Sequence, residues 1–161
     1  TAARHATGPG ASALAALEGG ALLVGFASGD LEVHRQGQAG PARTFVGEPS
    51  SRVTRVAAGP AGTVVAGFAD GRFGLWGLRR GRQLHLERLH GAVRHVNVDP
   101  DGAVQVATAL GQLRVLDVGV FELPYCDVLR QLWRAVPVAW EAGRLVRRPP
   151  PAGHTCRRGG D

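Results

Sequence analysis

The chain has 161 residues, of which 44% are hydrophobic, so it is long enough for one domain core and too apolar for wholesale disorder. All 19 basic residues are arginine, and lysine, isoleucine and methionine are absent, for a formal net charge of +6. Arginine, glycine, alanine and proline have GC-rich codons, so we interpret the basicity as background and expect no nucleic-acid partner. The chain has no apolar run near the roughly 20 residues of a membrane span, and its two cysteines are too few for the disulfide framework of a small secreted protein. We therefore expect no membrane partner.

Three stretches of the chain repeat one another at close to forty residues, namely 22–34, 64–76 and 104–116. Their turn glycines Gly29, Gly71 and Gly111 lie 42 and 40 positions apart. The upstream glycines Gly20, Gly62 and Gly102 have the same spacings of 42 and 40 positions. A fixed period of this size, with short apolar runs inside each unit, is typical of a radial or stacked array of small sheets.

Each repeat predicts strands separated by tight turns. The first repeat begins at Leu14 and Leu17 and predicts further strands over 21–27, 31–34 and 42–46. The second predicts strands over 53–58, 63–68, 73–78 and 83–89. Asp70-Gly71 is its strongest hairpin signal, because glycine at this position accepts a positive φ.

The third repeat predicts strands that begin at Val93, over 104–109 and over 113–118. Only the short segment 119–123 follows before Pro124, so we expect this repeat to need an outer strand from elsewhere.

The period changes after Pro124. Leu129, Leu132, Trp133 and Val136 are spaced as one apolar stripe of a helix, which Pro137 ends. Residues 138–140 and 144–146 are expected to form a small hairpin, and the segment beyond 147 is expected to be extended or disordered.

The repeats resemble the WD40 family of β-propellers over roughly residues 11–118. The resemblance rests on a V-x-x-V-x-x-x-P-x-G opening, on the Asp70-Gly71 hairpin, on the ending Leu75-Trp76 and on His90 before the third repeat. The opening is formed by Val53, Val56, Pro60 and Gly62, and again by Val93, Val96, Pro100 and Gly102. The resemblance implies an all-β fold of three propeller blades.

Three blades cannot close a ring, because propellers have about four to eight. We therefore expect the chain to be the C-terminal part of a larger propeller, with three blades over 1–120 and a helix, hairpin and tail over 121–161. The exposed blade faces would be covered by the remaining blades, in the same or another chain, or by a protein partner.

In WD40 relatives, partners commonly contact the loops between the fourth and first strands and between the second and third strands. By position, the resemblance assigns partner binding to Asp30, Glu48, Arg52, Asp70, Arg72, Arg88, His90 and Gln112.

The sequence offers little chemistry. Cys126, His154 and Cys156 lack the paired spacing of a zinc site, so we interpret the cysteines as one partly buried thiol and one tail thiol and expect no metal. Arg79, Arg80 and Arg82 form a local cationic patch, interpreted as a solvated loop. We expect no catalytic residue, no cofactor and no small-molecule substrate.

The function that these observations favour is a non-enzymatic protein-interaction scaffold, a cytoplasmic subunit of a bacterial complex. Two alternatives stay open. One is a regulatory or sensor segment of a larger bacterial multidomain enzyme such as an NTPase, kinase or protease. The other, which the sequence favours less, is a nucleic-acid-binding module.

Overall fold

A computed structural model describes residues 10–45, 51–121, 123–148, 151 and 153–157. The chain divides into two compact units, Thr1–Val118 and Gly119–Asp161. The sequence places this boundary at residue 120, and the independence of the two parts as domains stays a prediction.

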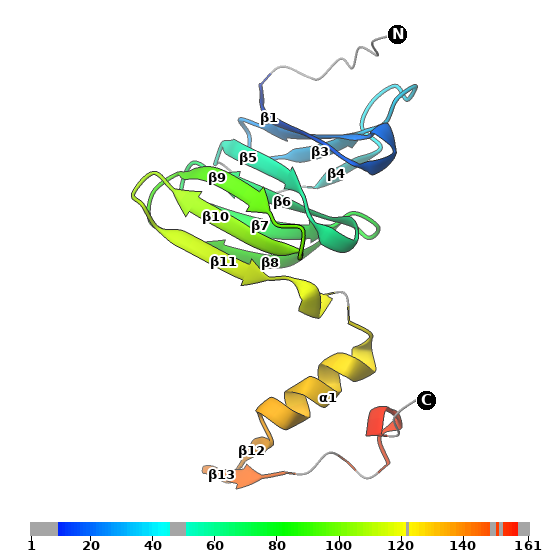
Figure 1. The fold of residues 1–161 in the computed structure, drawn as a ribbon, viewed down its shortest axis with the longest axis vertical. Helices are drawn as coiled ribbons and strands as arrows, with labels where there is room; N and C mark the ends of the chain where they lie inside the picture. The colour runs from blue at the N-terminus through cyan, green and yellow to red at the C-terminus, as the bar shows by residue number, and fades with distance from the viewer. Residues whose placement is uncertain (1–9, 46–50, 122, 149–150, 152, 158–161) are drawn as a thin grey trace. The chain divides into compact units, whose positions relative to one another are not determined.

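The first unit consists of three antiparallel sheets, which we call blades 1, 2 and 3 (Figure 1). In each blade the strands follow one another in chain order, so every neighbouring pair is joined by a short turn or loop. Blade 1 contains β1 (Ala11–Ala16), β2 (Leu22–Phe26), β3 (Leu31–His34) and β4 (Arg43–Phe45). Blade 2 contains β5 (Val53–Ala58), β6 (Thr63–Phe68), β7 (Arg72–Gly77) and β8 (Arg82–Arg88). Blade 3 contains β9 (Val93–Val98), β10 (Ala103–Thr108) and β11 (Leu113–Asp117). The predicted all-β blade fold is confirmed.

The β6–β7 hairpin shows why this repeat needs its turn glycine. Gly71 has a φ of +88°, and a Cβ at this position would collide with the carbonyl oxygen of Leu89. The same close approach allows the amide of Leu89 to donate a hydrogen bond to the carbonyl of Gly71 at 2.9 Å. Glycine therefore ties the β6–β7 turn to the end of β8.

The blades pack face to face through alternate residues of their strands, because successive side chains of a strand point to opposite faces. Between blades 1 and 2, the core includes Leu23, Leu31, Val33, Phe45, Val53, Val64, Ala66, Phe68 and Trp76. Between blades 2 and 3, the core includes Val65, Phe73, Leu75, Val93, Val104, Val106 and Val118. Each face of blade 2 is therefore covered by a neighbouring blade.

The first strands of successive blades lie side by side and are linked by hydroxyl groups. Ser12 Oγ donates to the carbonyl of Val53 in the next blade at 2.7 Å, and Thr54 Oγ1 donates to the carbonyl of Val93 at 2.7 Å. Ser12 and Thr54 each occupy an irregular position in the pairing of the first strand with the second. The irregularity turns a polar side chain towards the following blade.

Each of these joints also depends on a glycine in the second strand. At Gly25 a Cβ would collide with the side chain of Val53, and at Gly67 it would collide with the side chain of Val93. Neither glycine has a positive φ. Their role is therefore to allow the first valine of the next blade to pack against the backbone.

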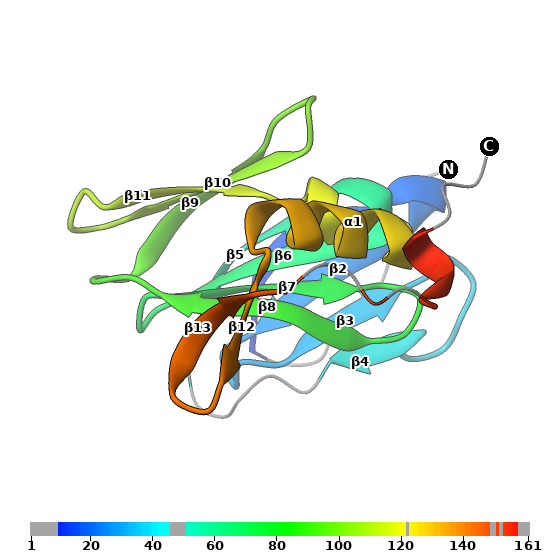
Figure 2. The ribbon, with the colours of Figure 1, turned by 90° about the horizontal axis from the view of Figure 1, so that it is seen from below.

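The second unit contains the helix α1 (Tyr125–Ala135) and the hairpin of β12 (Val138–Glu141) and β13 (Arg144–Arg147), as Figure 2 shows. The predicted helix and hairpin are thus both present. Two expectations for this part were wrong. Cys126 and Cys156 form a disulfide and are not separate thiols, and Thr155–Arg157 forms a short 3-10 turn beside the start of α1 where an extended tail was expected. The disulfide anchors the 3-10 turn to the helix, which explains why the segment around Cys156 is not an extended tail.

Candidate functional site

The antiparallel order of the strands separates the loops of blades 1 to 3 into two groups at opposite edges. We call rim 1 the edge formed by the loops β2–β3, β4–β5, β6–β7, β8–β9 and β10–β11, which lies at the left of Figure 1. Rim 2 is the edge formed by the loops β1–β2, β3–β4, β5–β6, β7–β8 and β9–β10. Glu48 lies outside the described residues, and the other seven predicted site residues all lie on rim 1.

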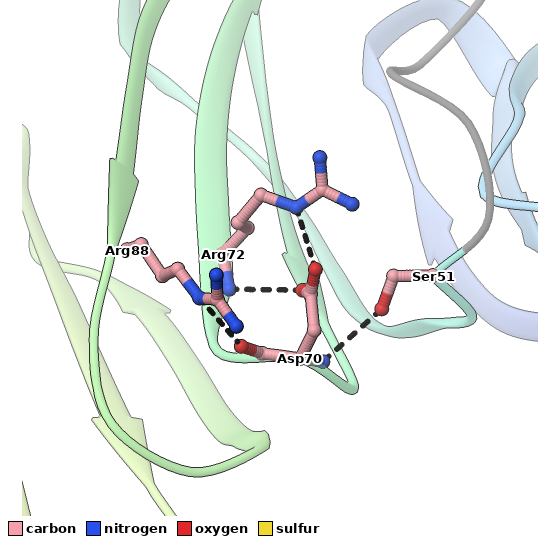
Figure 3. A network of polar contacts seen from close by, with 4 residues as sticks. All are labelled: Ser51, Asp70, Arg72 and Arg88. Carbon is pink, nitrogen blue, oxygen red and sulfur yellow. Dashed lines mark hydrogen bonds and ion pairs between the residues drawn. The ribbon is translucent and has the colours of Figure 1, made fainter.

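Asp70 is the centre of a polar network on rim 1 (Figure 3). Its carboxylate accepts hydrogen bonds from Arg72, at 2.6 Å from Nε and at 3.1 Å from the backbone nitrogen. Its backbone amide donates to Ser51 Oγ at 3.1 Å, and its carbonyl accepts a hydrogen bond from Arg88 Nε at 3.3 Å. The network therefore joins the β6–β7 hairpin to the loops on both sides of blade 2.

This network controls the charge of Asp70. Partial burial acts to raise the pKa of the carboxyl group, but the hydrogen bonds from Arg72, the charge of its guanidinium and the hydrogen bond with Ser51 outweigh burial. Together they hold the pKa of Asp70 below its ordinary value of 3.8. Asp70 is therefore ionised at neutral pH, and rim 1 presents a fixed ion pair there.

A second cluster connects the β8–β9 and β10–β11 loops. The backbone amide of His90 donates to Gln112 Oε1 at 2.7 Å, and the Nε2 of Gln112 lies 3.3 Å from His90 Nδ1. The backbone amide of Gln112 is 3.3 Å from the hydroxyl of Thr108, which is buried. The side chain of Gln112 thus fixes the position of His90 on the surface.

The two remaining predicted residues are less connected. Asp30 bonds locally with Ser28, whose hydroxyl donates to its carboxylate at 2.8 Å. Arg52 accepts a hydrogen bond from Ala69 through its carbonyl at 2.9 Å, while its exposed guanidinium has no ion-pair partner among the residues that the structure describes. The structure therefore brings Asp70, Arg72 and Arg88 together and pairs His90 with Gln112, but leaves Asp30 and Arg52 apart.

Sequence reasoning missed Ser51, a buried residue that holds the Asp70 amide. No local pattern could have found it, because the two residues are 19 positions apart and serine is common in loops.

We find no group of three or more His, Cys, Asp and Glu side chains placed to hold a metal ion among the described residues. Cys126 and Cys156 are bonded to each other, so their sulfur atoms are not thiolate ligands. His154 contacts the ring of Trp133 edge-on and accepts a hydrogen bond from the amide of Cys156 at 3.2 Å. Within the described ranges, no helix is long and apolar enough to cross a membrane.

Comparison with known proteins identifies the fold. No protein-family model matches the chain, and no curated protein matches it. Among solved structures, the crystal structure of the C-terminal WD40 domain of Sif2 is similar to it, with a TM-score of 0.60 and 22% sequence identity. The match covers 68% of this chain and 32% of that chain, so this chain spans about a third of its structural relative.

The class that the fold defines is a β-propeller of the WD40 type. The described part of the chain contains three of its blades, and the resemblance that the repeats predict is confirmed at the level of fold.

Proposed function

We propose that this chain is part of a propeller that acts as a non-enzymatic protein-interaction scaffold, and that another segment or another chain completes it. The observation that carries this proposal is that no described residue of the first unit covers the outer face of blade 3. On this face β11 exposes Leu113 (66% exposed) and Val115 (52% exposed). Their counterparts one repeat earlier, Phe73 and Leu75, are each only 1% exposed because blade 3 covers them.

The same positions in blade 1 follow the same rule. Leu31 and Val33 correspond to Phe73 and Leu75, and both lie in the core between blades 1 and 2. Burial of each such side chain is worth about 1.5–3 kcal/mol. An apolar face that is covered in two blades and exposed in the third therefore favours a further protein surface against β11.

The edge of blade 3 supports the same proposal. In blades 1 and 2 the third strand pairs with a fourth, but in the described residues β11 ends its sheet. An unpaired strand edge exposes backbone donors and acceptors that another strand can satisfy. We propose that the completing segment supplies this strand.

Sedimentation velocity tests the role of the blade 3 face. We expect the isolated chain to form particles heavier than one 16.8 kDa chain, and the double variant Leu113→Arg/Val115→Arg to be a folded monomer. Leu132→Arg/Leu145→Arg is the matched control, because these second-unit leucines are also at least half exposed. A wild-type chain that is folded and strictly monomeric would contradict the role proposed for the blade 3 face.

We propose that rim 1 contributes the partner contacts, through Asp30, Arg52, Asp70, Arg72, Arg88, His90 and Gln112, and the partner contact predicted for Glu48 stays a prediction outside the described residues. Its polar network preorganises the surface, which lowers the entropy cost of binding. Arg72 forms the ion pair with the Asp70 carboxylate, so the better test changes Arg52 and Arg88, whose side chains are exposed. Arg88 donates to the backbone carbonyl of Asp70 and leaves that ion pair in place when it is changed.

The variant Arg52→Glu/Arg88→Glu is expected to weaken capture of a co-purified partner at least tenfold in a pull-down titration, with an unchanged circular dichroism spectrum. Arg144→Glu/Arg147→Glu makes the same change of charge on β13 and serves as the control. Equal capture of the partner by wild type and by the rim 1 variant would contradict the proposal that rim 1 binds the partner.

The cytoplasmic location and the bacterial complex stay predictions. The disulfide between Cys126 and Cys156 weighs against a reducing compartment, because cytosolic thiols are mostly kept reduced.

A further inference from the structure

Rim 2 contains a groove between blades 1 and 2, at the edge opposite to the predicted site. The groove has a volume of about 1140 Å³, and its walls are the loops β1–β2, β3–β4, β5–β6 and β7–β8. Sequence reasoning assigned no role to these loops and interpreted Arg79, in one of them, as part of a solvated patch. We call this hollow the rim 2 groove.

The groove is strongly cationic. Arg35, Arg43 and Arg79 line it, and among the described residues Glu18 is the one carboxylate of its lining. None of the three arginines forms an ion pair with a carboxylate of the described residues. Their guanidinium groups are exposed and available to a ligand.

One of these arginines is held in place across the groove. Arg43, at the start of β4 in blade 1, donates from Nη2 to the carbonyl oxygen of Arg79 in blade 2 at 3.3 Å. A guanidinium has five donors in a fixed fork, so this bond leaves others for a carboxylate. The contact also links the two sides of the groove.

The walls of the groove are backbone and small side chains, mainly glycine, alanine and proline. The wall on blade 2 is the turn η2 (Pro60–Gly62), where Thr63 Oγ1 donates to the carbonyl of Pro60 at 2.6 Å and the amide of Leu78 donates to the carbonyl of Gly62 at 2.8 Å. These bonds stabilise the turn, and its small residues let a ligand backbone approach closely.

From this arrangement we infer that the rim 2 groove binds an extended, acidic peptide segment of a partner protein. Three guanidiniums against one carboxylate match the charge of glutamate and aspartate side chains, and the walls of small residues accommodate a peptide backbone. In the part of the chain that the structure describes, no aromatic side chain lines the groove, and aromatic stacking surfaces are typical of single-stranded nucleic-acid binding. The inference rests on the proposed binding role of the propeller but concerns the opposite rim.

Fluorescence anisotropy of the full chain with a labelled ten-residue peptide of alternating glutamate and alanine tests this inference. We expect saturable binding that weakens as salt is raised, because surface charges are screened. A peptide with glutamine in place of glutamate is expected to bind at least tenfold more weakly. The variant Arg35→Glu/Arg43→Glu/Arg79→Glu is expected to raise the Kd for the glutamate peptide at least tenfold.

The matched control is Arg94→Glu/Arg144→Glu/Arg147→Glu, which makes the same change of net charge outside the groove. Equal loss of binding in both variants would show a non-specific charge effect and overturn the inference, as would tighter binding of a labelled twenty-nucleotide single strand than of the peptide. If the peptide fails to bind while the Leu113 and Val115 variant still changes the mass of the particle, only the groove assignment fails.

Discussion

Asp70 takes part in four hydrogen bonds through its carboxylate, amide and carbonyl groups, with Ser51, Arg72 and Arg88. Asp70 therefore links the β6–β7 hairpin, through its backbone, to Ser51 in the loop before β5 and to Arg88 at the end of β8, while its carboxylate holds Arg72. Its carboxylate is partly buried, with 29% of the side chain exposed, so its ion pair with Arg72 is less screened than a fully exposed pair.

Replacement of this carboxylate is predicted to be costly. Asp70→Asn is expected to lower the free energy of unfolding by about 1–2 kcal/mol, because it removes charge-assisted hydrogen bonds. The folded-state pKa of Asp70 lies below the unfolded value, so this stabilisation is complete above the unfolded pKa and is lost as pH falls through the folded pKa. Urea unfolding from pH 3 to 7 checks this.

The difference between wild type and Asp70→Asn is expected to be constant above about pH 5 and to shrink below about pH 4. Asp101→Asn removes an exposed carboxylate from the β9–β10 turn and is the control. A difference that grows towards acid pH would contradict this assignment.

Among single residues, the turn glycines could be predicted because they recur at a fixed period. That partners bind the rim 1 residues stays a prediction. Sequence reasoning missed contacts that join distant loops, such as Ser51 with Asp70, because nothing in the local sequence marks them. The pairing of Cys126 with Cys156 was missed for the same reason, since they are 30 positions apart.

At the scale of elements, the joint between blades depends on the fit of one glycine against one valine. Gly67→Ala is predicted to lower the free energy of unfolding by about 1–3 kcal/mol, because the added methyl group collides with Val93. Gly77→Ala in the neighbouring strand β7 is the control, since its added Cβ would have no neighbour closer than 3.8 Å. Thermal and urea unfolding measure both variants.

A second change isolates the collision. In the double variant Gly67→Ala/Val93→Ala the added methyl group has space. We therefore expect the loss of unfolding free energy in the double variant to be smaller than the sum of the losses in the two single variants. Strict additivity would show that glycine is needed for some other reason than this contact.

Strand positions were predicted within one or two residues in most cases, because glycine and proline turns bound each strand on both sides. Prediction of the faces was harder. Alternation identifies two faces in each blade, but only packing shows that one blade's second strand touches the next blade's first valine. The rim 2 groove was invisible to sequence reasoning, since its three arginines come from loops of two different repeats.

At the scale of the whole molecule, the second unit depends on a covalent link. None of the residues of α1 is buried, and an isolated helix of 11 residues is marginal in water. The disulfide between Cys126 and Cys156 anchors the helix to the turn at Thr155–Arg157. In the chain-entropy account, closure of a loop of this length contributes about 4 kcal/mol.

Reduction with dithiothreitol, or Cys126→Ser/Cys156→Ser, is therefore predicted to accelerate amide hydrogen exchange in α1 at least tenfold. The blades contain no cysteine, so peptides from β5 to β7 provide the reference within the same sample. Unchanged protection of α1 after reduction would show that other contacts hold the helix.

Blade 3 lacks the hydroxyl and the glycine that join blade 1 to blade 2 and blade 2 to blade 3. Arg94 occupies the place of Ser12 and Thr54, and Ala107 occupies the place of Gly25 and Gly67. If another blade packed against blade 3 with valine as the first residue of its first strand, this valine would collide with the methyl group of Ala107. It would also face the guanidinium of Arg94 where the earlier blades have the hydroxyl of Ser12 or Thr54. A sheet that packs after blade 3 would therefore need a first residue smaller than valine and a hydrogen-bond acceptor for the Arg94 guanidinium, so this contact differs in chemistry from the two contacts before it.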